Sequence, residues 1–262
     1  MTGYEHLKRS DEGQVATVTL ARPEAHNALN AALIEELTRC FEGLADDERV
    51  RVVVLEGGGR SFCAGADVGY MRETARFAYE ENLEDARRLG EMFWVLDECP
   101  KPVVAKVRGA AIGGGAGLVA VADVAVAEEG TRFAFSEVRL GIAPATIAPF
   151  VVRKVGISHA RSLFLTGEPF DTQRAREIGL VHEVAPEAAL DAATAEKVDH
   201  LLHGGAMAQA TVKGLLRRLE STESMEQPGL TARVISELRT GEEGQEGLAA
   251  FLERREPNWR RE

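Results

Sequence analysis

Two glycine-rich segments are the first places where this chain could do chemistry. They run from Gly57 to Ala66 and from Gly109 to Gly117, and each follows a short apolar run. Glycine lets the backbone approach a ligand closely, and a helix that begins after such a loop presents free N–H groups and the positive end of its dipole. This arrangement suits the binding of a phosphate or the stabilisation of an oxyanion. Tight turns that pack a strand against a helix explain the same glycines equally well.

Glu137 is the carboxylate that stands out for acid–base work. It lies in the apolar stretch Phe133–Leu140, so we expect the side chain to be partly buried. Burial raises the pKa of a carboxyl group, which is what a general acid or base near neutrality needs. A buried ion pair with Arg132 or Arg139 is the competing interpretation.

Other reactive side chains give weaker signals. No G-x-S-x-G sequence offers a serine nucleophile. Cys63 lies in the first glycine segment without a histidine nearby in sequence, which favours a packing role. His200 and His203 are three residues apart without a third ligand, so we predict surface residues and no metal site. Three cysteines, far apart in the sequence, form no disulfide framework and suit a reducing cytoplasm.

Two nucleotide-binding interpretations of the glycines are weak. Gly115 to Ala120 matches G-x-G-x-x-A, but the next strand is expected near Asp123. Too few residues remain for the crossover helix of a dinucleotide-binding unit. A phosphate-binding P-loop is absent as well, because no Gly-Lys-Ser/Thr follows either segment.

Composition excludes several classes of protein. The 262 residues carry 31 Lys and Arg against 42 Asp and Glu, a formal net charge of −11 without a basic tract. Nucleic-acid binding is therefore not expected. The longest uncharged run, residues 109–122, is too short and too rich in glycine for a membrane helix, and residues 1–11 lack the apolar core of a signal peptide. We expect a cytoplasmic protein with no nucleic-acid or membrane partner.

The elements that must position these residues follow an α/β pattern. Strands are expected at 14–20, 51–55, 102–107 and 124–127, and Asn30 fits the N-cap of a helix. Strands that alternate with helices predict a sheet covered on both faces. Beyond Ala145 the pattern is almost entirely helical and amphipathic. We predict an α/β core at residues 1–190 and a helical region at 191–262, packed on the core or on a neighbouring subunit.

Several ordered motifs give the chain a family resemblance. They are Arg22-Pro-Glu-Ala-His-Asn-Ala-Leu29, Ser61-Phe-Cys-Ala-Gly-Ala-Asp67, Lys101-Pro-Val-Val-Ala through Gly113-Gly-Gly115, Phe164-Leu-Thr-Gly167 and Ala175-Arg-Glu-Ile-Gly-Leu-Val-His-Glu-Val184. Together they resemble the enoyl-CoA hydratase/isomerase (crotonase) superfamily over almost the whole chain. The resemblance implies a crotonase-like spiral of ββα turns and C-terminal helices that assemble homotrimers, often paired into homohexamers. It also implies an acyl-CoA substrate and no metal or redox cofactor, coenzyme A being part of the substrate.

The resemblance also assigns roles to particular residues. The backbone N–H groups of Ala66 and Gly114 would form an oxyanion hole for the thioester carbonyl, and Glu137 would transfer protons. Backbone around Ala64 would contact the adenine, and the segment after Arg22 would line the path of coenzyme A. The positions assigned to coenzyme A binding in this way are Arg22, Ala25, Ala64 and Asp67.

One departure from the family pattern leaves the reaction open. Typical hydratases carry a first glutamate where this chain has Gly117, which cannot transfer a proton. Hydration would then use Glu137 alone or another proton donor, and the segment from Ser136 to Phe150 resembles hydratases of branched or carboxylated enoyl-CoA, such as methylglutaconyl-CoA. A Δ3,Δ2-enoyl-CoA isomerase, which works with one glutamate, is the alternative. A non-catalytic acyl-CoA-binding oligomer is the third interpretation.

Overall fold

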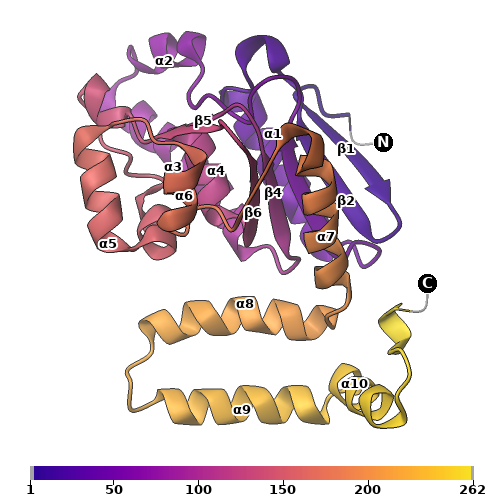
Figure 1. Ribbon diagram of the computed structural model, residues 1–262. Coiled ribbons are helices and arrows are strands. Elements are labelled where there is room, and N and C mark those ends of the chain that lie inside the picture. The colour runs from indigo at the N-terminus through magenta and orange to yellow at the C-terminus, as the bar shows by residue number, and fades with distance from the viewer. Residues whose placement is uncertain (1–2, 261–262) are drawn as a thin grey trace.

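A six-stranded sheet forms the centre of the protein, whose computed structural model describes residues 3–260. Its strands lie in the order β1 (Leu7–Glu12), β2 (Val15–Leu20), β3 (Val52–Gly57), β4 (Val103–Val107), β6 (Val124–Glu128) and β8 (Glu183–Ala185) (Figure 1). β1 pairs with β2 antiparallel, and every other pair in this sheet is parallel. Two short strands, β5 (Ala110–Ile112) and β7 (Arg132–Ala134), form a separate parallel pair. Parallel strands need long crossover connections, which the helices supply.

Ten α-helices make those connections and continue to the C-terminal end. They are α1 (Ala31–Asp46), α2 (Val68–Thr74), α3 (Tyr79–Glu98), α4 (Gly114–Val121), α5 (Ala148–Thr166), α6 (Thr172–Glu177), α7 (Leu190–Leu202), α8 (Ala206–Ser221), α9 (Gln227–Thr240) and α10 (Glu242–Glu253) among residues 3–260. A short 3₁₀ helix, η2 (Glu137–Leu140), precedes α5. Within the described residues, no helix combines the length and apolar character that a membrane span requires.

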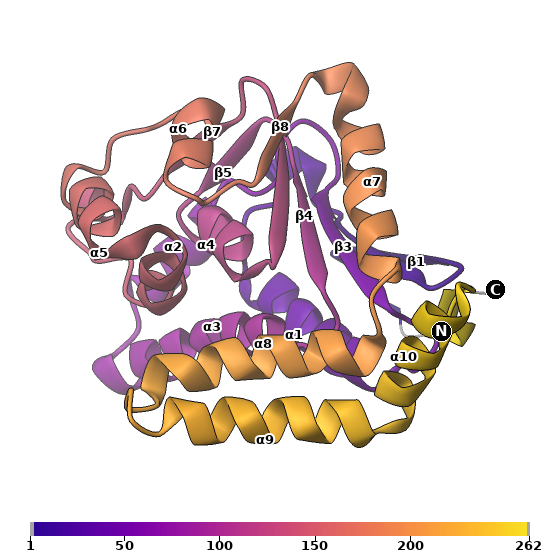
Figure 2. The ribbon, with the colours of Figure 1, turned by 60° about the horizontal axis from the view of Figure 1, so that its bottom comes forward.

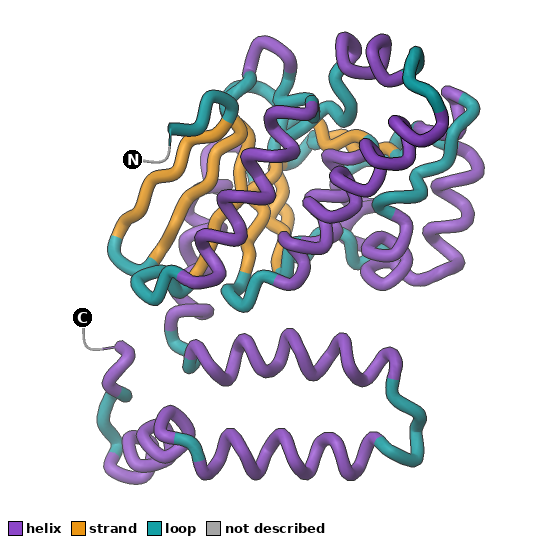
Figure 3. The backbone as a smooth tube through the Cα atoms, turned by 180° about the vertical axis from the view of Figure 1, so that it is seen from behind, coloured by secondary structure: helices purple, strands orange, loops and turns teal. Residues whose placement is uncertain are grey.

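The sheet is covered on both faces, as the alternating pattern predicts. Val53 and Leu55 of β3 belong to the larger core, which includes the buried sides of α1 and α3. Val52 and Val54 belong to a second core on the side of α7. A strand buried on both faces needs apolar residues throughout, which explains the uninterrupted apolar run at 52–55. Figure 3 shows the strands side by side above the last helices of the chain.

The last three helices, α8 to α10, form an arm below the sheet, with α8 and α9 side by side (Figure 2). Polar contacts join this arm to the core. Lys213 Nζ donates to the carboxylate of Asp123 at 2.6 Å and to the carbonyl of Lys101 at 3.1 Å. Arg217 donates to the carbonyl of Asp97 at 2.9 Å. The predicted helical region therefore comprises α7, which packs on the sheet, and an arm whose first helix contains no buried residue.

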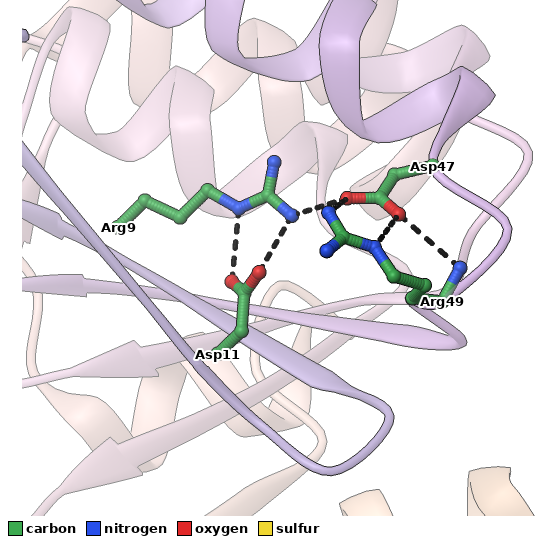
Figure 4. A network of polar contacts seen from close by, with 4 residues as sticks. All are labelled: Arg9, Asp11, Asp47 and Arg49. Carbon is green, nitrogen blue, oxygen red and sulfur yellow. Dashed lines mark hydrogen bonds and ion pairs between the residues drawn. The ribbon is translucent and has the colours of Figure 1, made fainter. Parts of the chain in front are cut away.

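An ionic network ties the outer strand β1 to the end of α1 (Figure 4). Arg9 donates two hydrogen bonds to Asp11, at 2.9 and 2.8 Å, and one to Asp47 at 2.6 Å. Arg49 donates two more side-chain bonds to Asp47, both at 3.0 Å. These bonds, from Arg49 first and then from Arg9, hold the pKa of Asp47 well below its usual range. The network therefore joins β1, the edge strand of the sheet, to the loop that follows α1.

Candidate active site

The two glycine segments lie against each other along a seam of backbone contacts. Cys63 N–H donates to the carbonyl of Ala110, and Ile112 N–H donates to the carbonyl of Cys63, both at 3.0 Å. A Cβ atom added at Gly65 would lie 2.8 Å from the Ile112 carbonyl oxygen, and Gly65 has φ +92°. Only glycine fits this conformation and this contact. The close approach that the glycine content suggested is therefore present.

Ala66 and Gly114, the two predicted oxyanion donors, lie at the end of this seam. The backbone of Leu29 pairs with both neighbours of Ala66. Leu29 N–H donates to the carbonyl of Gly65 at 2.7 Å, and the carbonyl of Leu29 accepts from Asp67 N–H at 2.9 Å. Gly114 is the first residue of α4, where N–H groups have no partner within the helix. Among residues 3–260, no hydrogen bond from either N–H is formed. Two free donors, one of them at the positive end of a helix, can hold a developing negative charge.

Glu137 points its carboxylate at the same place. A Cβ atom added at Gly113, next to Gly114, would lie only 2.9 Å from Glu137 Oε1. The other oxygen, Oε2, is buried and has no hydrogen-bond partner in the described chain. Burial raises the pKa of this carboxyl above its ordinary value, and only the residue's own N–H opposes the shift. The partial burial that the sequence predicts for Glu137 is confirmed, and it acts on the pKa in the expected direction.

The competing ion pair is not formed. Within residues 3–260, no salt bridge joins Glu137 to Arg132 or Arg139. The side chain of Arg139 packs instead at the end of α5, where its Nε lies 3.3 Å from the Cβ position of Gly167. Glu137 is left available for chemistry rather than structure.

Apolar side chains occupy the space beside Gly117. A Cβ atom there would collide with the Ile147 side chain and lie 3.0 Å from Phe93 Cε1. Gly117 is buried, as are both neighbours. A glutamate at this position would have no room, because apolar side chains are packed there. Of the two carboxylates that the resemblance implies, only the one at Glu137 is therefore present.

Asn27 is a site residue that sequence reasoning missed. It is fully buried and has φ +56°. Its Oδ1 accepts from the N–H of Arg22 at 2.9 Å, and its Nδ2 donates to the carbonyls of Gly58 and Ser61 at 2.9 and 2.8 Å. It thus holds the N-terminal motif against the first glycine segment. The signal was its place inside that motif, but asparagine before a helix usually indicates only a turn.

Replacing Asn27 by alanine is expected to destabilise the protein by about 3 kcal/mol, because buried backbone groups lose their partners and alanine disfavours positive φ. Denaturant unfolding measures this change. Asn27→Gly is the matched control, since it loses the same bonds but tolerates the φ angle, and it should cost less by about 1 kcal/mol. An alanine variant as stable as the native protein would contradict the conclusion that Asn27 holds the N-terminal motif against the first glycine segment.

The four residues assigned to coenzyme A lie together around the first glycine segment. Arg22 pairs with Asp67 at 2.9 Å, and Asp67 also caps α2 by accepting from Gly69 and Tyr70. Burial acts to raise the pKa of Asp67, but bonds from Tyr70, Arg22 and Gly69 outweigh it and hold the pKa below the ordinary value. Ala64 N–H donates to the carbonyl of His26, the residue after Ala25, at 3.0 Å.

The other reactive side chains that the sequence offers, one cysteine and two histidines, lie in positions typical of structural or surface residues. Cys63 is fully buried, and burial raises the pKa of its thiol to about 12, so its predicted packing role is confirmed. His200 and His203 lie on and just after α7, and each is within 4 Å of an acidic neighbour on the same helix. Across residues 3–260, no group of three or more His, Cys, Asp and Glu side chains could hold a metal ion.

The family that this geometry suggests is shown by direct comparison. The family model described as enoyl-CoA hydratase/isomerase matches residues 10–262. The chain belongs to this family. An enoyl-CoA hydratase from Alternaria alternata is 36% identical over 252 residues, which cover 95% of this chain and 81% of the relative. The 2,3-dehydroadipyl-CoA hydratase of Escherichia coli K12 is 35% identical over 255 residues, 96% of this chain and 97% of the relative.

Solved structures give the same result for the fold. A crystal structure of an enoyl-CoA hydratase from Shewanella pealeana superposes with a TM-score of 0.94 at 38% identity, covering 98% of this chain and 96% of that one. The chain therefore has the fold of the enoyl-CoA hydratase/isomerase family, as predicted. Its helical arm is part of the superposed length.

Proposed function

We propose that this protein is an enoyl-CoA hydratase, which adds water across the 2,3 double bond of an enoyl-CoA thioester. The proposal rests on two free backbone N–H groups, at Ala66 and Gly114, and on the Glu137 carboxylate, which lies against Gly113 and whose Oε2 has no partner in the described chain. The two N–H groups can donate hydrogen bonds to the thioester carbonyl oxygen, and Glu137 can accept and return a proton. The family membership and the hydratase relatives support the same reaction.

The geometry accounts for each charge and proton of the addition. The carboxylate of Glu137 takes a proton from water while the water oxygen bonds to C3. The π electrons of the double bond then move toward the carbonyl, whose oxygen becomes an enolate oxygen held by Ala66 and Gly114. Glu137 returns the proton to C2, and the thioester re-forms. Stabilisation of the oxyanion is expected to make the largest contribution to lowering the activation free energy, since one such donor lowers it by about 3–4 kcal/mol.

Isomerisation is a second candidate, and one observation favours it. Ile147 and Phe93 occupy the space beside Gly117, so no carboxylate can extend from that position, and Glu137 is left as the candidate base. Moving one proton from C4 to C2 needs a single base and no activated water. Incubation with a 2-enoyl-CoA and with a 3-enoyl-CoA separates the two reactions. Hydration of the first without migration in the second supports a hydratase, migration without hydration supports an isomerase, and binding without turnover supports the non-catalytic alternative.

We further propose that Arg22, Ala25, Ala64 and Asp67 form the coenzyme A path. Ala64 and Ala25 are both half-buried, Ala64 N–H donates to the carbonyl of His26, the residue after Ala25, and the Arg22–Asp67 pair joins the two segments. Arg22→Ala is expected to weaken the binding of free coenzyme A in calorimetry. Unchanged affinity would remove Arg22 from the path.

The exposed apolar surface of the arm supports a homotrimer or homohexamer. A groove of about 540 Å³ lies between α8 and α9, lined by Val212, Leu215, Ile235 and Leu238 among others. Ile235 is 50% exposed, and Phe251 on α10 is 80% exposed. Apolar patches of this kind are typical of association surfaces. Ile235→Glu should lower the molecular mass of the oligomer measured by sedimentation equilibrium. Ser236→Glu, at the next residue and outside the groove lining, should leave this mass unchanged.

Two further properties belong to the proposal. No metal or redox cofactor is required, because two N–H groups and one carboxylate cover the whole addition, so activity should survive dialysis against a chelator. A cytoplasmic location fits the three cysteines, all unpaired and buried. Fractionation of cells tests the location.

A further inference from the structure

A cavity between the core and the arm has no part in the proposed reaction. Its volume is about 390 Å³, which lies within the range of small-molecule sites, about 300–1,000 Å³. Its lining comes from α3, from the end of α4 with the two residues that follow, from α5 and from α8. Ala66, Gly114 and Glu137 are not part of this lining. The cavity is therefore separate from the candidate active site.

Cations outnumber carboxylates around this cavity. The charged residues that line it are the cations Arg153 and Lys154 on α5 and Lys213 and Arg217 on α8, and the acids Asp97, Asp123 and Glu220. The whole chain carries a formal net charge of −11, so this local excess of positive charge runs against its composition. The complementary ligand for such a cavity is an anion.

The three carboxylates are engaged by only two of the four cations. Asp97 pairs with Arg153, and Glu220 lies 3.9 Å from the same guanidinium. Asp123 pairs with Lys213 at 2.6 Å. The acids of the cavity are thus already used, and they leave the other two cations without a carboxylate partner.

Those two cations, Lys154 and Arg217, form no salt bridge within residues 3–260. Lys154 Nζ donates to the carbonyls of Ala122 and Asp123. Arg217 uses one nitrogen, Nη1, to donate to the carbonyl of Asp97 at 2.9 Å. A guanidinium has five N–H donors in a planar fork that matches the oxygens of a phosphate or carboxylate. Most of the donors of Arg217 therefore stay available to a ligand.

Lys154 carries a charge that a bound anion would stabilise. Burial lowers the pKa of its ammonium group to about 8. The ionisable groups that act on it are, in decreasing order, Asp123, Arg153, Asp97 and Lys213, and the nearby His182 has a pKa lowered to about 4, mainly by burial. An anion in the cavity would favour the protonated form of Lys154, so anion binding and protonation should strengthen each other.

We propose that this cavity binds a small phosphate-type oxyanion through the guanidinium of Arg217 and the ammonium of Lys154. Inorganic phosphate and the phosphate group of a small organic ester share this chemistry. The inference is independent of the proposed reaction, because no group that takes part in that reaction lines the cavity. Loss of one result would leave the other standing.

Equilibrium dialysis with labelled inorganic phosphate, in the presence of saturating coenzyme A, tests the site. Because coenzyme A fills its own phosphate contacts, phosphate bound in addition reports a second site. Arg217→Gln is expected to weaken this binding by about ten-fold or more, the effect of losing a charge-assisted hydrogen bond. Arg218→Gln is the matched control, since Arg218 is exposed and outside the lining, and it should bind phosphate like the native protein.

Two results would overturn the proposal. One is the absence of phosphate binding, which is also the result expected if an acidic side chain of a second subunit fills the cavity. The other is binding that survives unchanged in both Arg217→Gln and Lys154→Met. The second variant removes the buried ammonium group, and circular dichroism checks that each variant is folded before its binding is compared.

Sulfate gives a test of Lys154 by pH, because the charge of sulfate is constant near neutrality. Its affinity should fall as pH rises through about 8, where Lys154 loses its proton. An affinity independent of pH would remove Lys154 from the site. Glycerol 3-phosphate, compared with inorganic phosphate, identifies the source of the oxyanion. Tighter binding of the ester would indicate an organic phosphate, and tighter binding of inorganic phosphate would indicate the free ion.

Discussion

Glu137→Gln is expected to reduce kcat by about 10⁴-fold, the upper end of the range for general acid–base catalysis. The loss is large because, in the proposed mechanism, the same carboxyl both takes the proton from water and delivers it to C2. Glutamine keeps the shape of the side chain, so affinity for coenzyme A should change little. Stopped or continuous assays with a 2-enoyl-CoA measure the loss, and calorimetry with free coenzyme A provides the control.

Although Glu137→Gln is expected to lose activity, it is expected to gain stability relative to the native protein as pH rises. The pKa of Glu137 is raised in the fold, so the folded state binds this proton more tightly than the unfolded chain does. The contribution of the group to stability is therefore complete below its unfolded pKa, about 4.3, and is lost as pH rises through the folded value. Glu137→Gln should gain on the native protein in thermal melts as pH rises toward neutrality. A variant that melts far below the native protein at pH 8 would show a structural role instead.

The same raised pKa predicts the acid limb of the rate profile. Glu137 must be ionised to accept a proton from water, so kcat/KM should fall as pH drops through a value above that of an ordinary glutamate. Initial rates across the acid range, at substrate concentrations well below KM, measure it. An acid limb at or below the ordinary value would contradict the assignment of Glu137 as the base.

Gly114→Pro is expected to reduce kcat by about 10²–10³-fold, the usual cost of one oxyanion donor. Gly114 is the first residue of α4, a position where proline fits a helix because no helical bond from its N–H exists. The substitution removes the donor and places a ring carbon where its hydrogen pointed. Helix content by circular dichroism should be unchanged.

Gly114→Ala is the matched control for this experiment. It adds a Cβ atom 2.8 Å from Leu29 Cδ1, the far end of a flexible side chain, and keeps the N–H. Its activity should therefore stay well above that of the proline variant. If alanine and proline are equally damaging, crowding against Leu29 is the cause and Gly114 is no oxyanion donor.

Much of the core could be predicted because burial leaves a periodic trace in the sequence. The expected strands at 14–20, 51–55, 102–107 and 124–127 correspond to β2, β3, β4 and β6. The Asn30 cap is confirmed, since its Oδ1 accepts from Leu33 N–H at 2.9 Å. β1 was missed because five of its six residues are polar, and only its pairing with β2 makes it a strand. An outer strand with one solvated face gives little local signal.

Contacts between distant residues account for what the sequence could not show of the site. The motifs placed Ala66, Gly114 and Glu137, but the packing of Ile147 on Gly117 joins residues 30 positions apart. The bonds of Asn27 reach Gly58 and Ser61 across similar distances in sequence. Such contacts depend on the folded path of the chain rather than on any local pattern.

The seam between the glycine segments also bears on how this fold changes its chemistry over evolution. In the proposed mechanism the carbonyl is held by main chain, through Ala66 and Gly114, so mutations that alter side chains elsewhere in the pocket would leave these two donors in place. The proton-handling groups can then be gained or lost one at a time, as the glycine at position 117 illustrates. Sequence drift in this pocket therefore redirects what happens to an enolate more readily than it destroys the capacity to form one.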